Sequence, residues 1–178
     1  MKATLGALIC LLTLVSCSSE PEEVIVPERT VVYHEDRLVI DGKELAFPLE
    51  KDAIVGMLGE PSQQFDLIST ILVWHHEGIF TYQDKGKSVV SSVAFELKPQ
   101  YIDYSPKSQF AGSVKVGDLE IHSGTTLEEL QEHGFKQAGW AADVMHLDKT
   151  KTYRVFVTYG LTSRNLFEVS IVTHGGED

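Results

Sequence analysis

The sequence predicts an α+β fold made of two tandem units, each an antiparallel sheet with one short helix, packed as one body. Three observations support this prediction. Segments rich in β-branched and aromatic residues recur between turn signals, which is typical of strands. Two short stretches instead repeat apolar residues three and four positions apart, as on one face of a helix. The same order of strand, glycine turn, strand and helix also occurs twice, over 38–97 and 114–173.

The first unit is expected to begin with a hairpin. Apolar and β-branched residues at 31–33 and 38–40 predict two strands. The Asp41-Gly42 pair that follows favours the positive φ angles of a tight turn. The chain should therefore double back through a strand at 44–47.

A short helix and further strands complete this unit. Ile54, Met57 and Leu58 stand at positions i, i+3 and i+4, which predicts one helix stripe within residues 50–58, ended by Gly59. After this helix, strands are expected at 71–74, 79–82 and 89–97. The first two of these runs form either a hairpin or one long bent strand.

The second unit is expected to follow the same order. Residues 114–121 predict a strand, a glycine turn and a strand. Thr125-Thr126-Leu127-Glu128 matches a capping box in which the first hydroxyl accepts a hydrogen bond from the Glu128 amide, with Leu127 and Leu130 as the buried stripe. Strands are then expected around 144–147, 153–159 and 166–173. The alternative is chance agreement among common signals, since only turn glycines and apolar alternation match.

The N-terminal segment predicts export. Residues 3–15 carry no charge, follow Lys2, and are too short to span a bilayer. They lead into Leu14-Val15-Ser16-Cys17, which resembles a bacterial lipobox. The resemblance implies cleavage before Cys17, lipidation of its thiol with a diacylglycerol, palmitate-type acylation of the new amino terminus, and sorting to the outer membrane favoured by Ser18. The alternative is an ordinary secreted protein cleaved near the same place.

These patterns divide the chain into six segments. They are a lipoprotein signal peptide at 1–16, lipidated Cys17 with a flexible tether at 17–30, a first α+β unit at 31–97, a linker at 98–112, a second α+β unit at 113–174, and a tail at 175–178. The linker holds three aromatic residues that either contact a partner or cover the seam between the units. These possible contact residues are Tyr101, Tyr104 and Phe110.

Composition limits the partners. The formal net charge is -11, and loss of Lys2 with the signal peptide changes the balance from 15 basic against 26 acidic residues to 14 against 26, or -12. An acidic chain repels nucleic-acid phosphates and anionic lipids, so no nucleic acid is expected, whereas a basic protein partner is compatible. The alternative is that the acidic surface only maintains solubility. With Cys10 removed and Cys17 lipidated, no disulfide is expected.

Catalytic motifs are absent from the sequence, so no catalytic residue and no cofactor are predicted. The cluster His75-His76-Glu77 is the one weak candidate for a metal site. As a strand it would direct His75 and Glu77 to one face, which gives at most two ligands. A hydrolytic site assembled from distant residues such as His76, Asp103 and Ser105 is a further alternative.

Several short motifs resemble a known family. They are Phe47-Pro48, Leu58-Gly59-Glu60-Pro61-Ser62, and Val73-Trp74-His75-His76-Glu77-Gly78-Ile79 with Tyr82. Together they resemble a two-repeat bacterial lipoprotein family of unknown function that tends to read Trp-Asp-x-x-Gly-Ile. His75 stands where the Asp usually stands, so a role of that acidic residue does not carry over.

The anchor followed by small helix-plus-sheet units is also similar to envelope-assembly lipoproteins and to periplasmic immunity lipoproteins, which both act by binding proteins. The expected function is therefore a membrane-anchored, periplasm-facing, non-catalytic protein-binding module in the outer membrane of a bacterial envelope. The alternative is a periplasmic hydrolase or metal-binding protein that uses the region His75-His76-Glu77.

Overall fold

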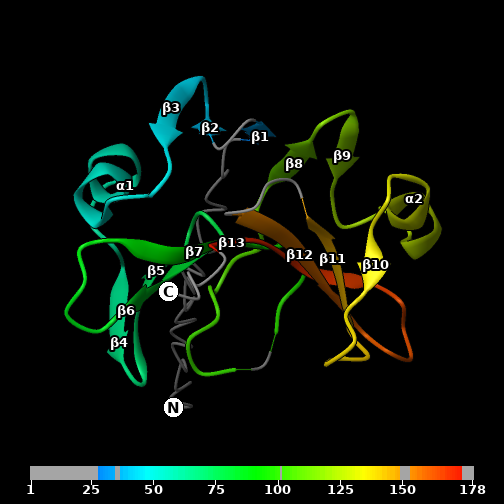
Figure 1. Ribbon diagram of the computed structural model, residues 1–178. Helices are drawn as coiled ribbons and strands as arrows, with labels where there is room; N and C mark the ends of the chain where they lie inside the picture. Colours follow the sequence, from blue (N-terminus) through cyan, green and yellow to red (C-terminus); the bar gives the residue numbers. More distant parts are fainter. Residues whose placement is uncertain (1–27, 35–36, 101, 149–152, 174–178) are drawn as a thin grey trace, which may run out of the picture.

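Two β-sheets stacked face to face, with one helix at each side, make up the fold (Figure 1). The computed structural model describes residues 28–34, 37–100, 102–148 and 153–173. The predicted signal peptide, Cys17 and nearly all of the tether lie outside the described residues, as do Tyr101 and the tail. Within the described ranges, no helix combines the length and apolar character needed to cross a membrane.

The smaller sheet has five strands in the order β3-β2-β1-β8-β9. Its central strand β1 pairs antiparallel with β2 and parallel with β8. The strand order is therefore symmetric about β1. The bounds are β1 Arg29–His34, β2 Arg37–Ile40, β3 Lys43–Ala46, β8 Gly112–Val116 and β9 Leu119–Ile121.

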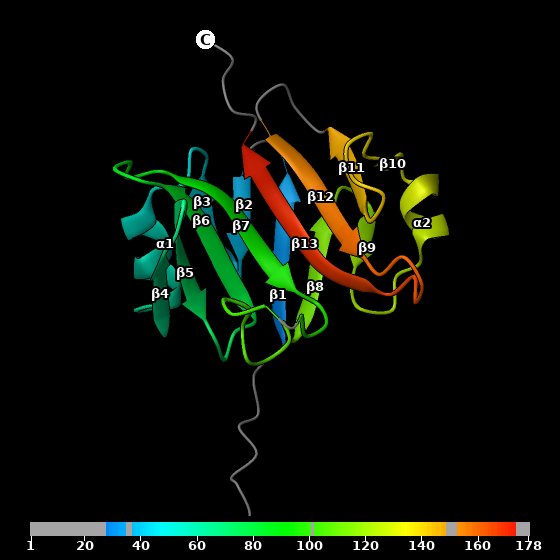
Figure 2. The ribbon, with the colours of Figure 1, turned by 90° about the horizontal axis from the view of Figure 1, so that it is seen from below.

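The larger sheet has eight strands in the order β10-β11-β12-β13-β7-β6-β5-β4 (Figure 2). All its neighbours pair antiparallel, and β7 joins β13 at the centre. The bounds are β4 Gln63–Asp66, β5 Ser69–Trp74, β6 Ile79–Asp84, β7 Val90–Glu96, β10 Lys136–Gln137, β11 Val144–Asp148, β12 Tyr153–Tyr159 and β13 Leu166–Thr173.

The predicted α+β class is wrong, because the described chain is mainly β and the two parts of the chain do not form separate sheets. Each sheet contains strands from both parts, and the β1–β8 pair is parallel rather than antiparallel. The physical reason is that each sheet buries its inner face against the other sheet. Helices α1 Lys51–Leu58 and α2 Leu127–Glu132, of 8 and 6 residues, are too short to cover either sheet.

The helices instead connect edge strands. Helix α1 links β3 to β4, and α2 links β9 to β10, so each runs from the edge of one sheet to the edge of the other (Figure 1). Ile54 of α1 and Leu127 and Leu130 of α2 join the main core. The helices therefore close the two sides of the sandwich.

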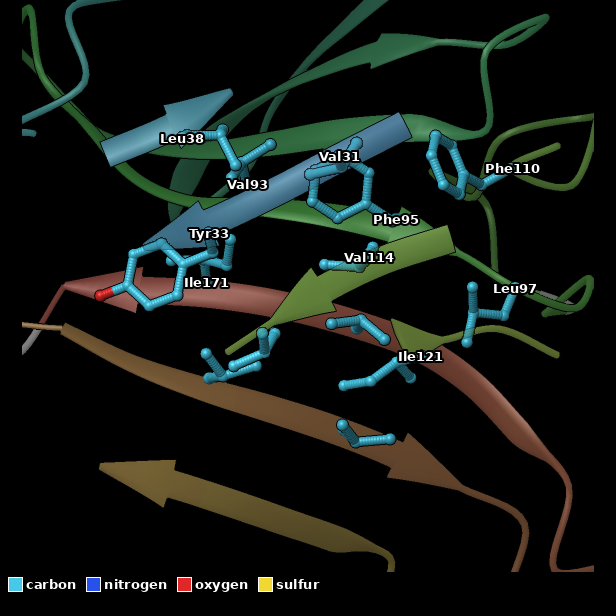
Figure 3. Packing of buried hydrophobic residues seen from close by; sticks show 14 of the residues in the cluster. Val31, Tyr33, Leu38, Val93, Phe95, Leu97, Phe110, Val114, Ile121 and Ile171 are labelled. Carbon is cyan, nitrogen blue, oxygen red and sulfur yellow. The ribbon is translucent and has the colours of Figure 1, made fainter. Parts of the chain in front are cut away.

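The core lies between the sheets (Figure 3). Val31 and Val114 of the smaller sheet face Phe95 and Ile171 of the larger one, and all four are completely buried. Burial of a side chain of this size contributes roughly 1.5–3 kcal/mol. Packing alone can thus hold the sandwich together without a disulfide.

Local signals position these elements. Asp41 and Gly42 have φ angles of 51° and 77°, which is the hairpin turn expected of this pair. The capping box of α2 is shifted by one residue from its predicted place, because Thr126 is the N-cap and its hydroxyl accepts from the amide of Glu129. Thr125 instead accepts from the amide of His122 at 3.0 Å.

Candidate interaction face

The predicted metal candidates diverge from one another. The segment 75–78 is a turn between β5 and β6, not a strand, so the chain forms a hairpin here. His75 is buried, with its Nε2 3.1 Å from Oε1 of Gln63, whereas His76 is exposed. Glu77 turns to Arg29, whose Nε lies 2.6 Å from its Oε2. Among the described residues, no group of three potential ligands could hold a metal ion.

The environment of His75 also favours a neutral ring. Burial lowers the pKa of His75, and the charges of Lys107 and His76 lower it further. Its backbone carbonyl accepts a hydrogen bond from the amide of Ser108 at 3.1 Å. His75 therefore helps to fix the segment that follows β7.

Part of that segment, around Tyr104, lies over the outer face of the larger sheet. This face carries a second apolar cluster of Ile71, Val73, Phe80 and Ala94. Tyr104 packs on it, with ring centroids 6.5 Å from Phe80 and 6.1 Å from Tyr82. The half-buried Tyr104 thus covers the sheet.

The structure places one of the other two aromatic residues of the linker. Phe110 is 5% exposed and packs against Phe95 at 5.1 Å between ring centroids, so its side chain belongs to the main core. Tyr101 lies outside the described residues. Tyr104 therefore covers the outer face of the larger sheet at β6 rather than a seam between two units, while Phe110 presents no side chain to a partner.

The residues considered for a hydrolytic site lie in separate surroundings. Ser105 is buried, and its hydroxyl has no hydrogen-bond partner among the described residues. Asp103 is exposed and lines a pocket beside Phe65, and His76 is exposed in the β5–β6 turn. The structure does not join these three residues into a catalytic arrangement.

Sequence reasoning missed a pair of carboxyl groups beneath the covering segment. Glu96 of β7 and Glu168 of β13 stand directly opposite each other on neighbouring strands. Gln100 bridges them, since its backbone N–H donates to Glu96 at 3.1 Å and its Nε2 to Glu168 at 3.2 Å. Ser170 hydrogen-bonds to Glu168 from the same strand.

Burial favours the protonated form of both carboxyl groups. Glu96 is completely buried, and this burial raises its pKa to about 7, with a smaller increase from the charge of Glu168. Burial also raises the pKa of Glu168, against the opposing effect of the hydrogen bonds from Gln100 and Ser170. A protonated carboxyl can donate to its neighbour, whereas two carboxylates repel. The only sequence signal was a charged residue inside the apolar run 93–97.

The same sheet face also carries unusual exposed apolar side chains. Leu67 and Ile68, in the β4–β5 turn, are 51% and 96% exposed, and Ile102 is 41% exposed. Together with Phe65 and Tyr104, Leu67 and Ile102 line a pocket of about 440 Å³. Clustered apolar side chains around a hollow are typical of interaction sites, whereas scattered single ones are not.

An aromatic group marks the other end of this face. Trp140 is 72% exposed and packs edge-on against Phe156 of β12, 6.0 Å away between ring centroids. The guanidinium of Arg154 lies 5.6 Å from the centre of the Phe156 ring, and Arg154 also pairs with Asp148. Tryptophan and arginine are both residue types enriched at protein interfaces.

The family model of a domain of unknown function, DUF7738, matches residues 30–131. The chain belongs to this family. No curated protein and no solved structure matches the chain. The DUF7738 region runs from β1 into α2, and so it includes the whole pocket and the covering segment. Glu168 and Trp140 lie beyond it.

Proposed function

We propose that this chain is a lipoprotein of the bacterial cell envelope, anchored through Cys17 to the outer membrane and facing the periplasm. In this role its folded part binds another protein and catalyses no reaction. The partner is either a component of envelope assembly or a periplasmic toxin that the chain inhibits. The lipobox resemblance at residues 14–17 and the acidic composition support the location and a basic partner.

The observation that carries the proposal is the cluster of Leu67, Ile68 and Ile102 around a pocket on one face of a two-sheet sandwich. These side chains leave apolar area in water that a partner could bury, at about 25 cal/mol for each Å². The outer face of the smaller sheet offers a contrast, since Lys115 and Glu120 are its exposed neighbours on β8 and β9. Of the two outer faces, the one on the larger sheet therefore exposes more apolar surface to a partner.

The test is crosslinking in living cells followed by purification of the full chain. The variant Leu67→Ser, Ile68→Ser and Ile102→Ser is expected to lose its stoichiometric partner while keeping its thermal stability, because these side chains are exposed. The control Lys115→Ser with Asp118→Ser leaves the net charge unchanged and should keep the partner. Equal recovery of the partner by both variants would contradict the proposal.

The anchor needs its own test. Cys17→Ala should abolish incorporation of labelled palmitate and leave unprocessed precursor, because the lipid is attached to that thiol before cleavage. Normal processing of this variant would refute the lipoprotein assignment. The identity of the partner then separates the two roles, since an assembly protein binds an outer-membrane component and an immunity protein binds one toxic enzyme.

A further inference from the structure

We propose that the pocket between the β4–β5 turn and residues 102–104 binds a segment of a partner protein that inserts one apolar side chain and places a lysine or arginine against Asp103. This inference rests on the proposed function and names the chemistry of its binding site. The pocket is lined by Phe65, Leu67, Ile102, Asp103 and Tyr104.

The shape and lining of the pocket fit an apolar side chain. Its volume of about 440 Å³ lies in the range of ligand sites, and four of its five lining residues are aromatic or aliphatic. Ile68, which follows the lining residue Leu67, is 96% exposed and adds apolar surface near the pocket. A side chain of leucine or phenylalanine size would bury this surface.

Asp103 supplies the charge preference. The described residues provide no hydrogen-bond donor and no ion-pair partner for its carboxylate. Other exposed aspartates do have partners: Asp41 pairs with Arg29 and Asp84 with Lys87. With the net charge of -11, an unpaired carboxylate favours a cation and disfavours an anionic lipid surface or a second copy of this acidic chain.

The neighbouring sheet edge favours a polypeptide over a small molecule. β4, which contributes Phe65, is the last strand of the larger sheet, and among the described residues only β5 pairs with it. Its second edge offers backbone N–H and C=O groups that an extended segment can match. A peptide along β4 can therefore reach the pocket with one of its side chains.

The pocket wall is also held in place before binding. The amide of Ser105 donates to the carbonyl of Ile102 at 3.0 Å, and Gln100 ties the segment to Glu96 and Glu168. The ring of Tyr104 packs edge-on against the ring of Tyr82, 6.1 Å away between centroids. A preformed wall reduces the entropy lost on binding, so a short segment can bind it.

Photocrosslinking of the full chain in cells tests the site. The photoreactive amino acid p-benzoylphenylalanine is placed at Ile68, at Trp140, or at the control position Lys115. We expect Ile68 to crosslink to one protein, within a segment that has an apolar residue next to lysine or arginine. Crosslinks from Ile68 to lipid, to another copy of the chain, or to a segment without this pair would overturn the inference.

A synthetic peptide of the crosslinked segment then tests the chemistry with the purified full chain. Ile102→Ser should weaken binding at least about tenfold, as expected for lost burial of a large apolar side chain. Asp103→Lys should weaken it by about fivefold or more, and replacing the basic residue of the peptide by glutamate should restore binding to this variant. Unchanged affinity in the Asp103 variant, or no rescue, would refute the charge pairing.

The crosslinking results at Ile68 and Trp140 also distinguish a failure of this inference from a failure of the proposed function. A protein crosslinked from Trp140 and not from Ile68 would overturn the pocket while leaving the binding function intact. If neither position crosslinks to a protein, both proposals fail.

Discussion

Deprotonation of Glu96 is expected to destabilise the fold as the pH rises, and Glu96→Gln should remove this loss. The pKa of Glu96 is about 7 in the folded chain against an ordinary value of 4.5. Between these two values the folded state binds more protons than the unfolded state, so stability is greatest below pH 4.5 and falls until about pH 7. At about 1.4 kcal/mol for each tenfold change in proton affinity, the loss between pH 5 and pH 8 is roughly 2–3 kcal/mol.

Urea unfolding of the purified protein at pH 5 and pH 8 measures this effect. Glutamine mimics the protonated carboxyl, so the variant should be more stable than the original chain at pH 8 and similar to it at pH 5. Glu168 remains in the variant and its pKa is raised in the same direction, so some dependence should persist. The control Glu132→Gln removes an exposed charge and should keep the full dependence. Identical pH dependence in Glu96→Gln and the original chain would refute the reasoning.

Two further substitutions test the packing of the chain. Gly78→Ala should lower the free energy of unfolding in urea by on the order of 3 kcal/mol, because its φ angle is +66° and an added Cβ would lie 2.1 Å from the amide nitrogen of Phe110. The control Gly86→Ala has a φ angle of +79° but no atom within 4 Å of the added Cβ, so it should cost only about 1 kcal/mol. An equal cost at both sites would contradict the clash. Thr126→Ala should lower the free energy of unfolding by about 1 kcal/mol, because the N-cap of α2 is lost. Thr126→Ser retains a hydroxyl and should keep most of the stability that the cap provides. Equal stability of the two variants would argue against the cap.

Local elements were predictable because their signals are local. The Asp41-Gly42 turn, the buried stripe of Leu127 and Leu130 and the apolar strands all follow from short patterns. The edge strands β4 and β10 were missed, because Gln63–Asp66 and Lys136–Gln137 are mostly polar and become strands through pairing with neighbours. Propensity is weak where pairing partners decide.

The fold class and the site depend on contacts between distant parts of the chain. Glu96 and Glu168 are brought together by the register of β7 and β13, which no pattern near either residue reveals. In the same way, the pocket forms only when residues 102–104 fold back beside the β4–β5 turn. Leu67 and Ile68 lie in no predicted element, and their exposure follows from the turn between β4 and β5, which the sequence analysis did not predict.

The two ends of the larger sheet differ in their outer covering, although the order of strands in the smaller sheet is symmetric about β1. On the β5–β6 side, Tyr104 covers Phe80 and creates a pocket with a carboxylate at its rim. On the β11–β12 side, Phe156 contacts the exposed Trp140 and the guanidinium of Arg154 instead. Arg154 is already paired with Asp148, whereas Asp103 at the pocket has no such partner among the described residues. A partner that spans this face would therefore find its charge preference at the pocket, and the group around Trp140 would contribute mainly aromatic surface.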